Sequence, residues 1–197
     1  MRQVSKDFGG LRAMAKGIFL AGGLGLAVGA AAPAQAQSIA TPVKPNVSLP
    51  GGASSLTETH DDWTVGCSVQ ADGKRCVMSQ ALGNKQTGQR LLSMELQPKD
   101  GAIEGVILAP FGLRLAKGLT LKVDDQEQLG EPAGFTTCVE AGCVVPIAFD
   151  ADQISKLSSG ETLTINAENG STSEPVKLTI SLKGFDAARK RSAELMQ

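Results

Sequence analysis

The sequence predicts a mainly β protein, an antiparallel β-sandwich or a flattened barrel with one short helix and a C-terminal helix. Short apolar runs alternate with polar residues along most of the chain after residue 60. Each run ends near Gly, Pro, Asn or Asp, which are residues that terminate strands. Strands with a single apolar face are not stable singly, so a second sheet or closure of the first must bury these faces.

Residues 1–36 are predicted to be a cleaved signal peptide. Four basic residues precede an uncharged stretch from Gly17 to Ala32, and Ala34-Gln35-Ala36 supplies a small-x-small cleavage site. The uncharged stretch is short and rich in glycine compared with the roughly 20 apolar residues of a membrane span. We therefore expect no integral membrane segment in the mature chain. The protein should be exported, either to the periplasm, to the outer membrane as an associated protein, or to the exterior.

Residues 37–60 are predicted to form a flexible arm, because they contain three prolines, adjacent glycines and many Ser and Thr without an apolar period. The folded β domain is expected to cover residues 61–185. Residues 186–197 should form a C-terminal helix or tail, since they include good helix formers but only a thin apolar stripe. The pattern leaves open whether this helix docks or frays.

The predicted strands follow one another at short intervals. The first spans Trp63–Val69, where apolar residues alternate with small or polar ones, and the second follows a turn at residues 71–73. Further alternating runs lie at residues 92–96, 119–123, 163–167 and 176–182. Asn169-Gly170 is predicted to turn a hairpin between the last two.

A short helix is predicted directly after Asp150. Asp150 can cap the helix, Gln153 occupies the capping-box position, and Gly160 follows the expected end. Ile154 and Leu157 are spaced so that both would face the sheet.

All four cysteines follow the predicted signal peptide, and an even number of cysteines in an exported chain predicts two disulfides. Of the three possible pairings, Cys67–Cys76 with Cys138–Cys143 fits the strand geometry best, because short turns would place the partners opposite each other. Long-range pairings would stabilise the protein more, so energetics does not exclude them. The spacing lacks the C-x2-C knuckles of zinc sites and the C-x-x-C of redox enzymes.

The composition argues against several functional classes. Aromatic residues make up 4% of the chain and its net charge is −1, so neither base stacking nor phosphate binding is favoured and no nucleic-acid partner is expected. The single His excludes metal sites with several imidazoles and most nucleophile–His pairs. We therefore expect no catalytic residues, no cofactor and no bound metal.

Two polar clusters in the sequence are candidate sites, but neither has the features of one. His60 precedes Asp61 and Asp62, but it lies at the end of the predicted arm, where no preorganised pocket is implied. Asp124 and Asp125 open a polar loop that lacks the EF-hand spacing for calcium. A deep pocket around His60, Asp124 or Asp125 would favour an enzyme or a carrier.

Three segments together resemble the invasion-associated locus B family of exported Gram-negative bacterial proteins. They are DDWTVGC at residues 61–67, LAPFGLRLAKGLTLKVDD at 108–125 and FTTCVEAGCVVPIAFD at 135–150. LKGFDAARK at 182–190 is similar to the closing segment of the family. Their order and spacing make the resemblance more specific than any one segment.

The resemblance implies a β-rich protein that is periplasmic, associated with the outer membrane or secreted. Some members are linked to entry into host cells, many occur in bacteria with no known invasive habit, and the family supplies no catalytic residues to carry over. Two hypotheses follow. The first is a non-enzymatic module that binds an unidentified envelope or host-surface protein, with Trp63 either a contact residue or a core anchor. The second is a periplasmic small-ligand carrier or envelope hydrolase with a deep pocket.

Overall fold

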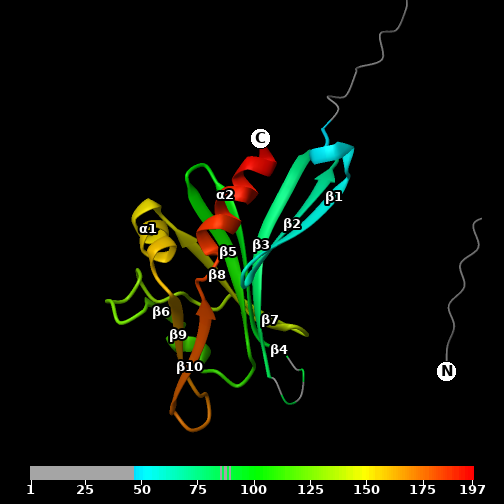
Figure 1. Ribbon diagram of the computed structural model, residues 1–197. Helices are drawn as coiled ribbons and strands as arrows, with labels where there is room; N and C mark the ends of the chain where they lie inside the picture. Colours follow the sequence, from blue (N-terminus) through cyan, green and yellow to red (C-terminus); the bar gives the residue numbers. More distant parts are fainter. Residues whose placement is uncertain (1–46, 85, 87, 89) are drawn as a thin grey trace, which may run out of the picture. The chain divides into compact units, whose positions relative to one another are not determined.

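The computed structural model describes residues 47–84, 86, 88 and 90–197 (Figure 1). The predicted signal peptide and the start of the predicted arm lie outside these residues and stay predictions. The strands are β1 (Ser55–His60), β2 (Trp63–Gln70), β3 (Gly73–Gly83), β4 (Arg90–Lys99), β5 (Ala102–Ala109), β6 (Thr120–Val123), β7 (Thr137–Val139), β8 (Gly142–Phe149), β9 (Thr162–Glu168) and β10 (Pro175–Ser181). The α-helices are α1 (Ala151–Ser159) and α2 (Phe185–Met196), and short 3-10 turns lie at Pro50–Gly52 and Leu115–Lys117.

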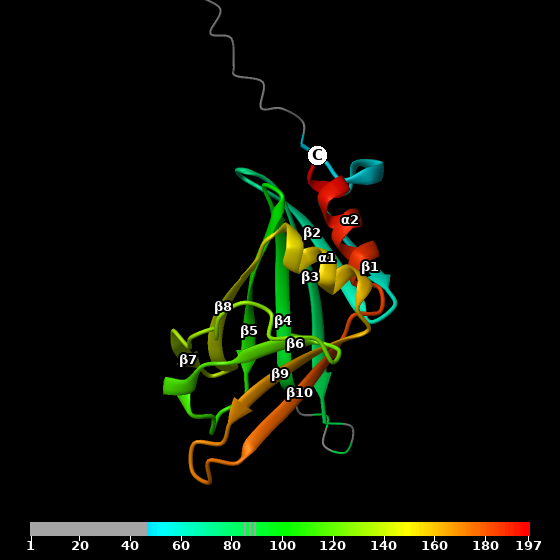
Figure 2. The same cartoon turned by 90° about the vertical axis from the view of Figure 1, so that its left-hand side faces the viewer.

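The strands form two antiparallel sheets. The large sheet has the order β1-β2-β3-β4-β5-β8-β7, and the small sheet has the order β10-β9-β6. Figure 2 shows the small sheet crossing one face of the large sheet obliquely. The mainly β prediction is confirmed, with one short helix and a C-terminal helix, whereas the flattened-barrel alternative is wrong because the two sheets do not join into a closed one.

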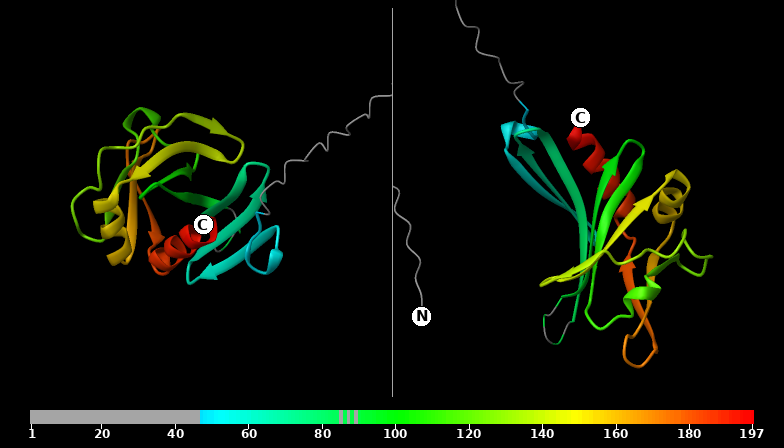
Figure 3. Two further views of the ribbon diagram at one scale, coloured as in Figure 1. Left: turned by 90° about the horizontal axis from the view of Figure 1, so that it is seen from above. Right: turned by 180° about the vertical axis from the view of Figure 1, so that it is seen from behind.

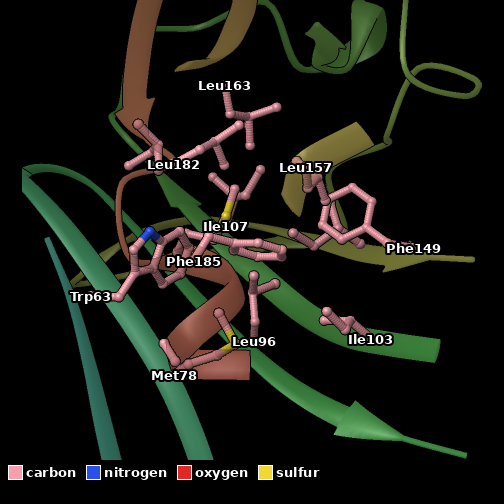
Figure 4. Close-up of a cluster of buried hydrophobic side chains, with 14 of the residues drawn as sticks. Trp63, Met78, Leu96, Ile103, Ile107, Phe149, Leu157, Leu163, Leu182 and Phe185 are labelled. Atoms are coloured by element: carbon pink, nitrogen blue, oxygen red, sulfur yellow. The ribbon is translucent and has the colours of Figure 1, made fainter. Parts of the chain in front are cut away.

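The strand register assigns each face of the large sheet a different character. Val65, Met78, Leu96 and Ile147 lie in one row of neighbours across β2, β3, β4, β5 and β8, and all four are buried. We call this side the inner face. It packs against α1, α2 and the small sheet, and Figure 4 shows the side chains that meet there.

Gly105 occupies the β5 position of that inner row, next to Leu96 and Ile147. A Cβ at this position would collide with the carbonyl oxygen of Glu95 and with the Leu96 side chain. The absence of a side chain at Gly105 therefore allows β4 and β5 to approach each other on the inner face.

The two sheets are joined at Ser181, the last residue of β10. Its carbonyl oxygen accepts hydrogen bonds from Trp63 Nε1 at 2.9 Å and from Gln80 Nε2 at 3.0 Å. Its backbone N–H donates to Gln80 Oε1 at 3.0 Å. The Gln80 side-chain amide thus donates to and accepts from the backbone of Ser181, as the backbone of a neighbouring strand would.

Helix α2 docks on the inner face and does not fray. Phe185, Ala188, Ser192 and Leu195 are buried, and the Phe185 ring meets Trp63 edge-on with 5.4 Å between centroids. The thin stripe seen in the sequence is therefore sufficient, because it faces strands that are already apolar.

Helix α1 begins where the sequence predicts. Asp150 accepts a hydrogen bond from the backbone of Gln153, and the Gln153 side chain accepts one from the backbone of Asp150, which completes the capping box. Ile154 and Leu157 are buried as expected.

Three elements differ from the predictions. Residues 55–60, which the sequence placed in the flexible arm, form β1 and pair with β2. Ala102–Ala109 forms β5, which was missed because apolar residues on both faces conceal its alternation. The expected Asn169-Gly170 turn is a longer loop, in which Asn169 Oδ1 accepts hydrogen bonds from the backbone of Ser171 and Thr172.

Candidate binding face

The side of the large sheet opposite the core carries mostly small and polar residues. Thr64, Ser79, Glu95, Val106 and Pro146 form one row of cross-strand neighbours on this side, which we call the outer face. In the described part of the chain, both helices and the small sheet lie on the inner face (Figure 3). The outer face is therefore turned toward solvent.

The outer face contains three neighbouring hollows of about 440, 470 and 370 Å³. The first lies over β3, β4 and β5, the second over β1, β2 and β3, and the third includes Ser93 and Arg90 of β4. We call the third the Ser93 hollow. Glu95 lines all three, so it lies at the centre of the face.

The hollows of the outer face form where the side chains of the sheet are small. Gly66 and Ser68 of β2 lie beside Arg75 and Val77 of β3 in the second hollow, and nothing lies within 4 Å of where a Cβ on Gly66 would be. The floor is consequently backbone and short side chains, which leaves space for groups from another molecule.

The charges on the outer face are only partly neutralised within the chain. Lys99 Nζ lies 2.9 Å from Glu104 Oε2, and this hydrogen bond raises the pKa of Lys99 above its ordinary value. Arg75, Arg90 and Glu95 form no ion pair within the described residues. Ionised groups that lack an internal partner remain available for a partner in solution.

Trp63, which the sequence singled out as a contact residue or a core anchor, is fully buried on the inner face. Its indole N–H is bound to Ser181 and its ring packs against Phe185. The structure therefore gives it the role of an anchor and places it outside the candidate face.

The structure pairs Cys67 with Cys76 and Cys138 with Cys143. Each pair joins residues directly opposite in an antiparallel hairpin, β2–β3 for the first and β7–β8 for the second. Cys67 and Cys76 are buried, whereas Cys138 is exposed. Both disulfides staple hairpins, and neither lines the hollows of the outer face.

His60 belongs to the contact between β1 and α2. Its Nε2 lies 3.4 Å from Glu58 Oε2, and Glu58 accepts two hydrogen bonds of 2.8 Å from Arg191. The hydrogen bond from the Arg191 guanidinium is the main cause that lowers the pKa of Glu58. The cluster fastens a helix to an edge strand.

Asp124 has a structural role as well. Its carboxylate accepts hydrogen bonds from the backbone of Glu161 and Thr162, which ties the loop after β6 to the start of β9. Neither Asp124, Asp125 nor His60 lines the hollows described above.

The described residues contain no group of three or more His, Cys, Asp or Glu side chains placed to hold a metal ion. Within the same residues, neither helix has the length and apolarity needed to cross a membrane.

Sequence reasoning missed the outer face. Its residues come from five strands, β2, β3, β4, β5 and β8, which lie far apart in the sequence. No local motif therefore marks them. One signal for the outer face was present in the sequence. Alternate positions of β2 carry the small residues Thr64, Gly66 and Ser68, although the solvent-facing side of a strand can accommodate long side chains.

Comparison with known proteins gives consistent results. The family described as "Invasion associated locus B (IalB) protein" matches residues 63–193. An invasion protein B homolog of Brucella abortus strain 2308 is 50% identical over 145 residues, which cover 73% of this chain and 83% of that protein. Invasion protein B of Bartonella bacilliformis is 39% identical over 158 residues, covering 78% and 84%.

The solved structures include a similar fold. The crystal structure of invasion associated protein B from Bartonella henselae superposes with a TM-score of 0.67 at 32% sequence identity. The match covers 71% of this chain and 96% of the Bartonella chain.

Proposed function

Since the chain belongs to the invasion-associated locus B family, we propose that it is an exported, non-enzymatic binding protein whose outer face contacts an envelope or host-surface protein. The observation that carries this proposal is the outer face itself, a wide sheet surface with three adjoining hollows and unpaired charges. Surfaces of this kind, polar with partly buried apolar residues such as Val77 and Val106, are typical of contacts between soluble proteins.

Two further features support export. Both disulfides require an oxidising compartment, and the predicted signal peptide at residues 1–36 would deliver the chain there. The relatives are named as invasion proteins, so the proposed contact has two settings, the bacterial envelope and host-cell entry.

The hydrolase alternative finds little support in the geometry. The three hollows lie on the surface of one sheet, and the polar clusters at His60 and Asp124 are occupied by structural contacts. An active site would require titratable groups converging in a pocket.

Photo-cross-linking in the source bacterium tests the proposal. A benzophenone side chain placed at Val106 on the outer face should form an adduct with another protein, whereas the same group at exposed Lys177 on β10 should not. Adducts from Lys177 but not Val106 would contradict the assigned face. Protease access on intact cells then separates the two settings, because only a surface-exposed protein is cleaved before the outer membrane is opened.

A further inference from the structure

The two sheets of the described chain end in four edge strands, β1 and β7 of the large sheet and β10 and β6 of the small sheet. An edge strand presents backbone N–H and C=O groups that can pair with a strand of another molecule, and folded proteins usually prevent such pairing. β7 is protected by its length of three residues. β6 is covered by the loop that follows it, in which the Leu129 N–H donates to the carbonyl oxygen of Leu121.

The edge of β10 is protected as well. The register and the hydrogen bonds at both ends of the β9–β10 ladder make positions 176, 178 and 180 face β9, so the intervening residues face the free edge. Among these, Pro175 has no N–H, Lys177 carries a charge, and the backbone of Ser181 is bound by Gln80. Proline and lysine are common means of preventing pairing at an edge.

β1 is the remaining edge and has none of these protections. The carbonyl oxygen of Ser54 accepts a hydrogen bond of 2.8 Å from the Val69 N–H, which makes 54 and 69 a hydrogen-bonded pair of the β1–β2 ladder. Such pairs recur at every second residue of an antiparallel ladder, so positions 56, 58 and 60 face β2. The backbone groups that point away from the sheet belong to Ser55, Thr57 and Thr59.

The first disulfide supports this alternation independently. The Cα atoms of Cys67 and Cys76 are 4.1 Å apart, the short spacing of a non-hydrogen-bonded pair between β2 and β3. The backbone of Cys67 therefore faces β1, where its partner is Leu56. Figure 1 shows β1 at the margin of the large sheet.

The outward groups of β1 are free to pair. Their N–H and C=O groups have no hydrogen-bond partner within the described part of the chain, and all three residues are exposed. β1 is six residues long and contains no Pro, Lys or Arg. It is therefore the long edge of this fold that lacks a device against strand pairing.

A second copy of this chain matches the edge. Two β1 strands related by a two-fold axis at Thr57 run antiparallel, so that each outward N–H meets an outward C=O. Thr57 then lies opposite Thr57 of the second copy, and Ser55 lies opposite Thr59 of the second copy. Hydroxyl-bearing residues that face each other in this way are favourable cross-strand neighbours.

The charges of β1 are compatible with this register. Glu58, its one acidic residue, lies opposite Leu56 of the second copy and not opposite another carboxylate. Its charge is already neutralised, because it accepts two hydrogen bonds of 2.8 Å from Arg191 of its own chain. Like charges directly opposite each other would destabilise the pairing, and this register has none within β1.

We propose that β1 is a dimerisation edge, through which two copies of the chain join their large sheets into one continuous antiparallel sheet. The outer faces of the two copies then form a single surface, because Ser55, Thr57 and Thr59 lie on the same side as the outer face of β2. This inference goes beyond the proposed protein contact and does not depend on it, since it concerns the purified chain alone.

Sedimentation equilibrium of the purified exported protein tests the proposal. The contact consists of one strand pair and is small, so we expect a monomer–dimer equilibrium with a Kd of about 10 μM. A protein that remains monomeric at about 20-fold that concentration would overturn the proposal.

Charged substitutions at Thr57 then locate the two-fold axis. Thr57→Lys and Thr57→Glu should each weaken dimerisation at least about tenfold, because each places two like charges directly opposite each other. An equimolar mixture of the two variants should dimerise again, since Lys then lies opposite Glu. Undiminished dimerisation of the single variants, or no recovery in the mixture, would overturn the assigned register.

Thr179→Lys and Thr179→Glu are the matched controls. Thr179 is an exposed threonine of β10 whose backbone likewise faces a free edge, so these variants should dimerise like the wild type. Equal losses at positions 57 and 179 would show a general effect of charge and would overturn the role of β1. Failure of the cross-linking at Val106 would leave these results unaffected, so the two proposals fail separately.

Discussion

Gly184 sets the geometry of the connection between β10 and α2. Its φ of +86° lies in the left-handed region, and a Cβ there would collide with the carbonyl oxygen of His60. We predict that Gly184→Ala lowers the free energy of unfolding by roughly 2–4 kcal/mol, because both the backbone strain and the clash oppose docking of α2. Urea titration followed by circular dichroism measures the change.

Gly134→Ala is the control for that substitution. Gly134 has no left-handed φ, and nothing lies within 4 Å of where its Cβ would be. Its replacement should change stability by less than about 1 kcal/mol in either direction. Equal losses in both variants would contradict the role assigned to Gly184.

Trp63 and Gln80 share an acceptor, the carbonyl oxygen of Ser181. Either donor keeps that oxygen hydrogen-bonded when the other is removed, but removal of both leaves it unpaired. We therefore predict that Trp63→Phe combined with Gln80→Met destabilises the protein by about 0.5–2 kcal/mol more than the sum of the single variants. A double-mutant cycle from urea unfolding measures this coupling, and strict additivity would show that the two donors act independently.

At the level of elements, the contact between β1 and α2 should depend on pH. The Arg191 hydrogen bond lowers the pKa of Glu58 below its ordinary value of 4.5, so the ionised form stabilises the folded state. This stabilisation is fully present above pH 4.5 and is lost as the pH falls through the lowered pKa. Glu58→Gln should therefore be less stable than the wild type at pH 7, and the difference should shrink below pH 4.5.

Unfolding free energies of the wild type and Glu58→Gln, measured from pH 7 to pH 3, test this dependence. Glu131→Gln serves as the control, since Glu131 is an exposed carboxylate without an ion pair in the described chain. A constant difference between the wild type and Glu58→Gln over the whole range would contradict the linkage.

The two disulfide hairpins should differ in their sensitivity to reduction. Cys138 of β7 is exposed, whereas Cys67 and Cys76 are buried within the hydrophobic core. A thiolate must reach a sulfur atom to reduce the bond, so Cys138–Cys143 should open first in mild reductant. Alkylation and peptide mapping over time follow the order. In denaturant the preference should disappear, and earlier labelling of Cys67 under native conditions would contradict the prediction.

The sequence predicts elements well where one local pattern is sufficient. Helix α1 begins at its capping box, and the Cys67–Cys76 hairpin has the expected register, because both depend on residues a few positions apart. β1 could not be recognised from its own residues, since its strand character comes from pairing with β2. The Ser93 hollow was likewise invisible, because it combines Asp62, Arg90 and Glu95, which only the sheet brings together.

For the whole folded unit, α2 should be indispensable. Phe185 and Leu195 are buried in the common core, and burial of each such side chain contributes about 1.5–3 kcal/mol. A chain that ends at Gly184 should therefore be unfolded or strongly destabilised. The single Trp reports this directly, because Trp63 is shielded in the intact protein and its fluorescence emission should shift to longer wavelength in the truncated chain.

Removal of Gln197, which is exposed at the chain end, is the control and should leave the emission unchanged. An intact-like emission spectrum and a cooperative urea transition in the chain ending at Gly184 would show that β2 and β3 complete their packing without the helix.

The hydrogen bond between Trp63 and Ser181 spans 118 residues, and the ion pair between Glu58 and Arg191 spans 133. The first strands of the domain therefore obtain their final partners from β10 and α2, which are synthesised much later. During export, β1 to β3 would emerge first, and their apolar face would stay uncovered until β10 and α2 follow. This fold is thus completed only after residue 191 has emerged, and a chain that stalls before residue 181 would remain open to proteases and chaperones.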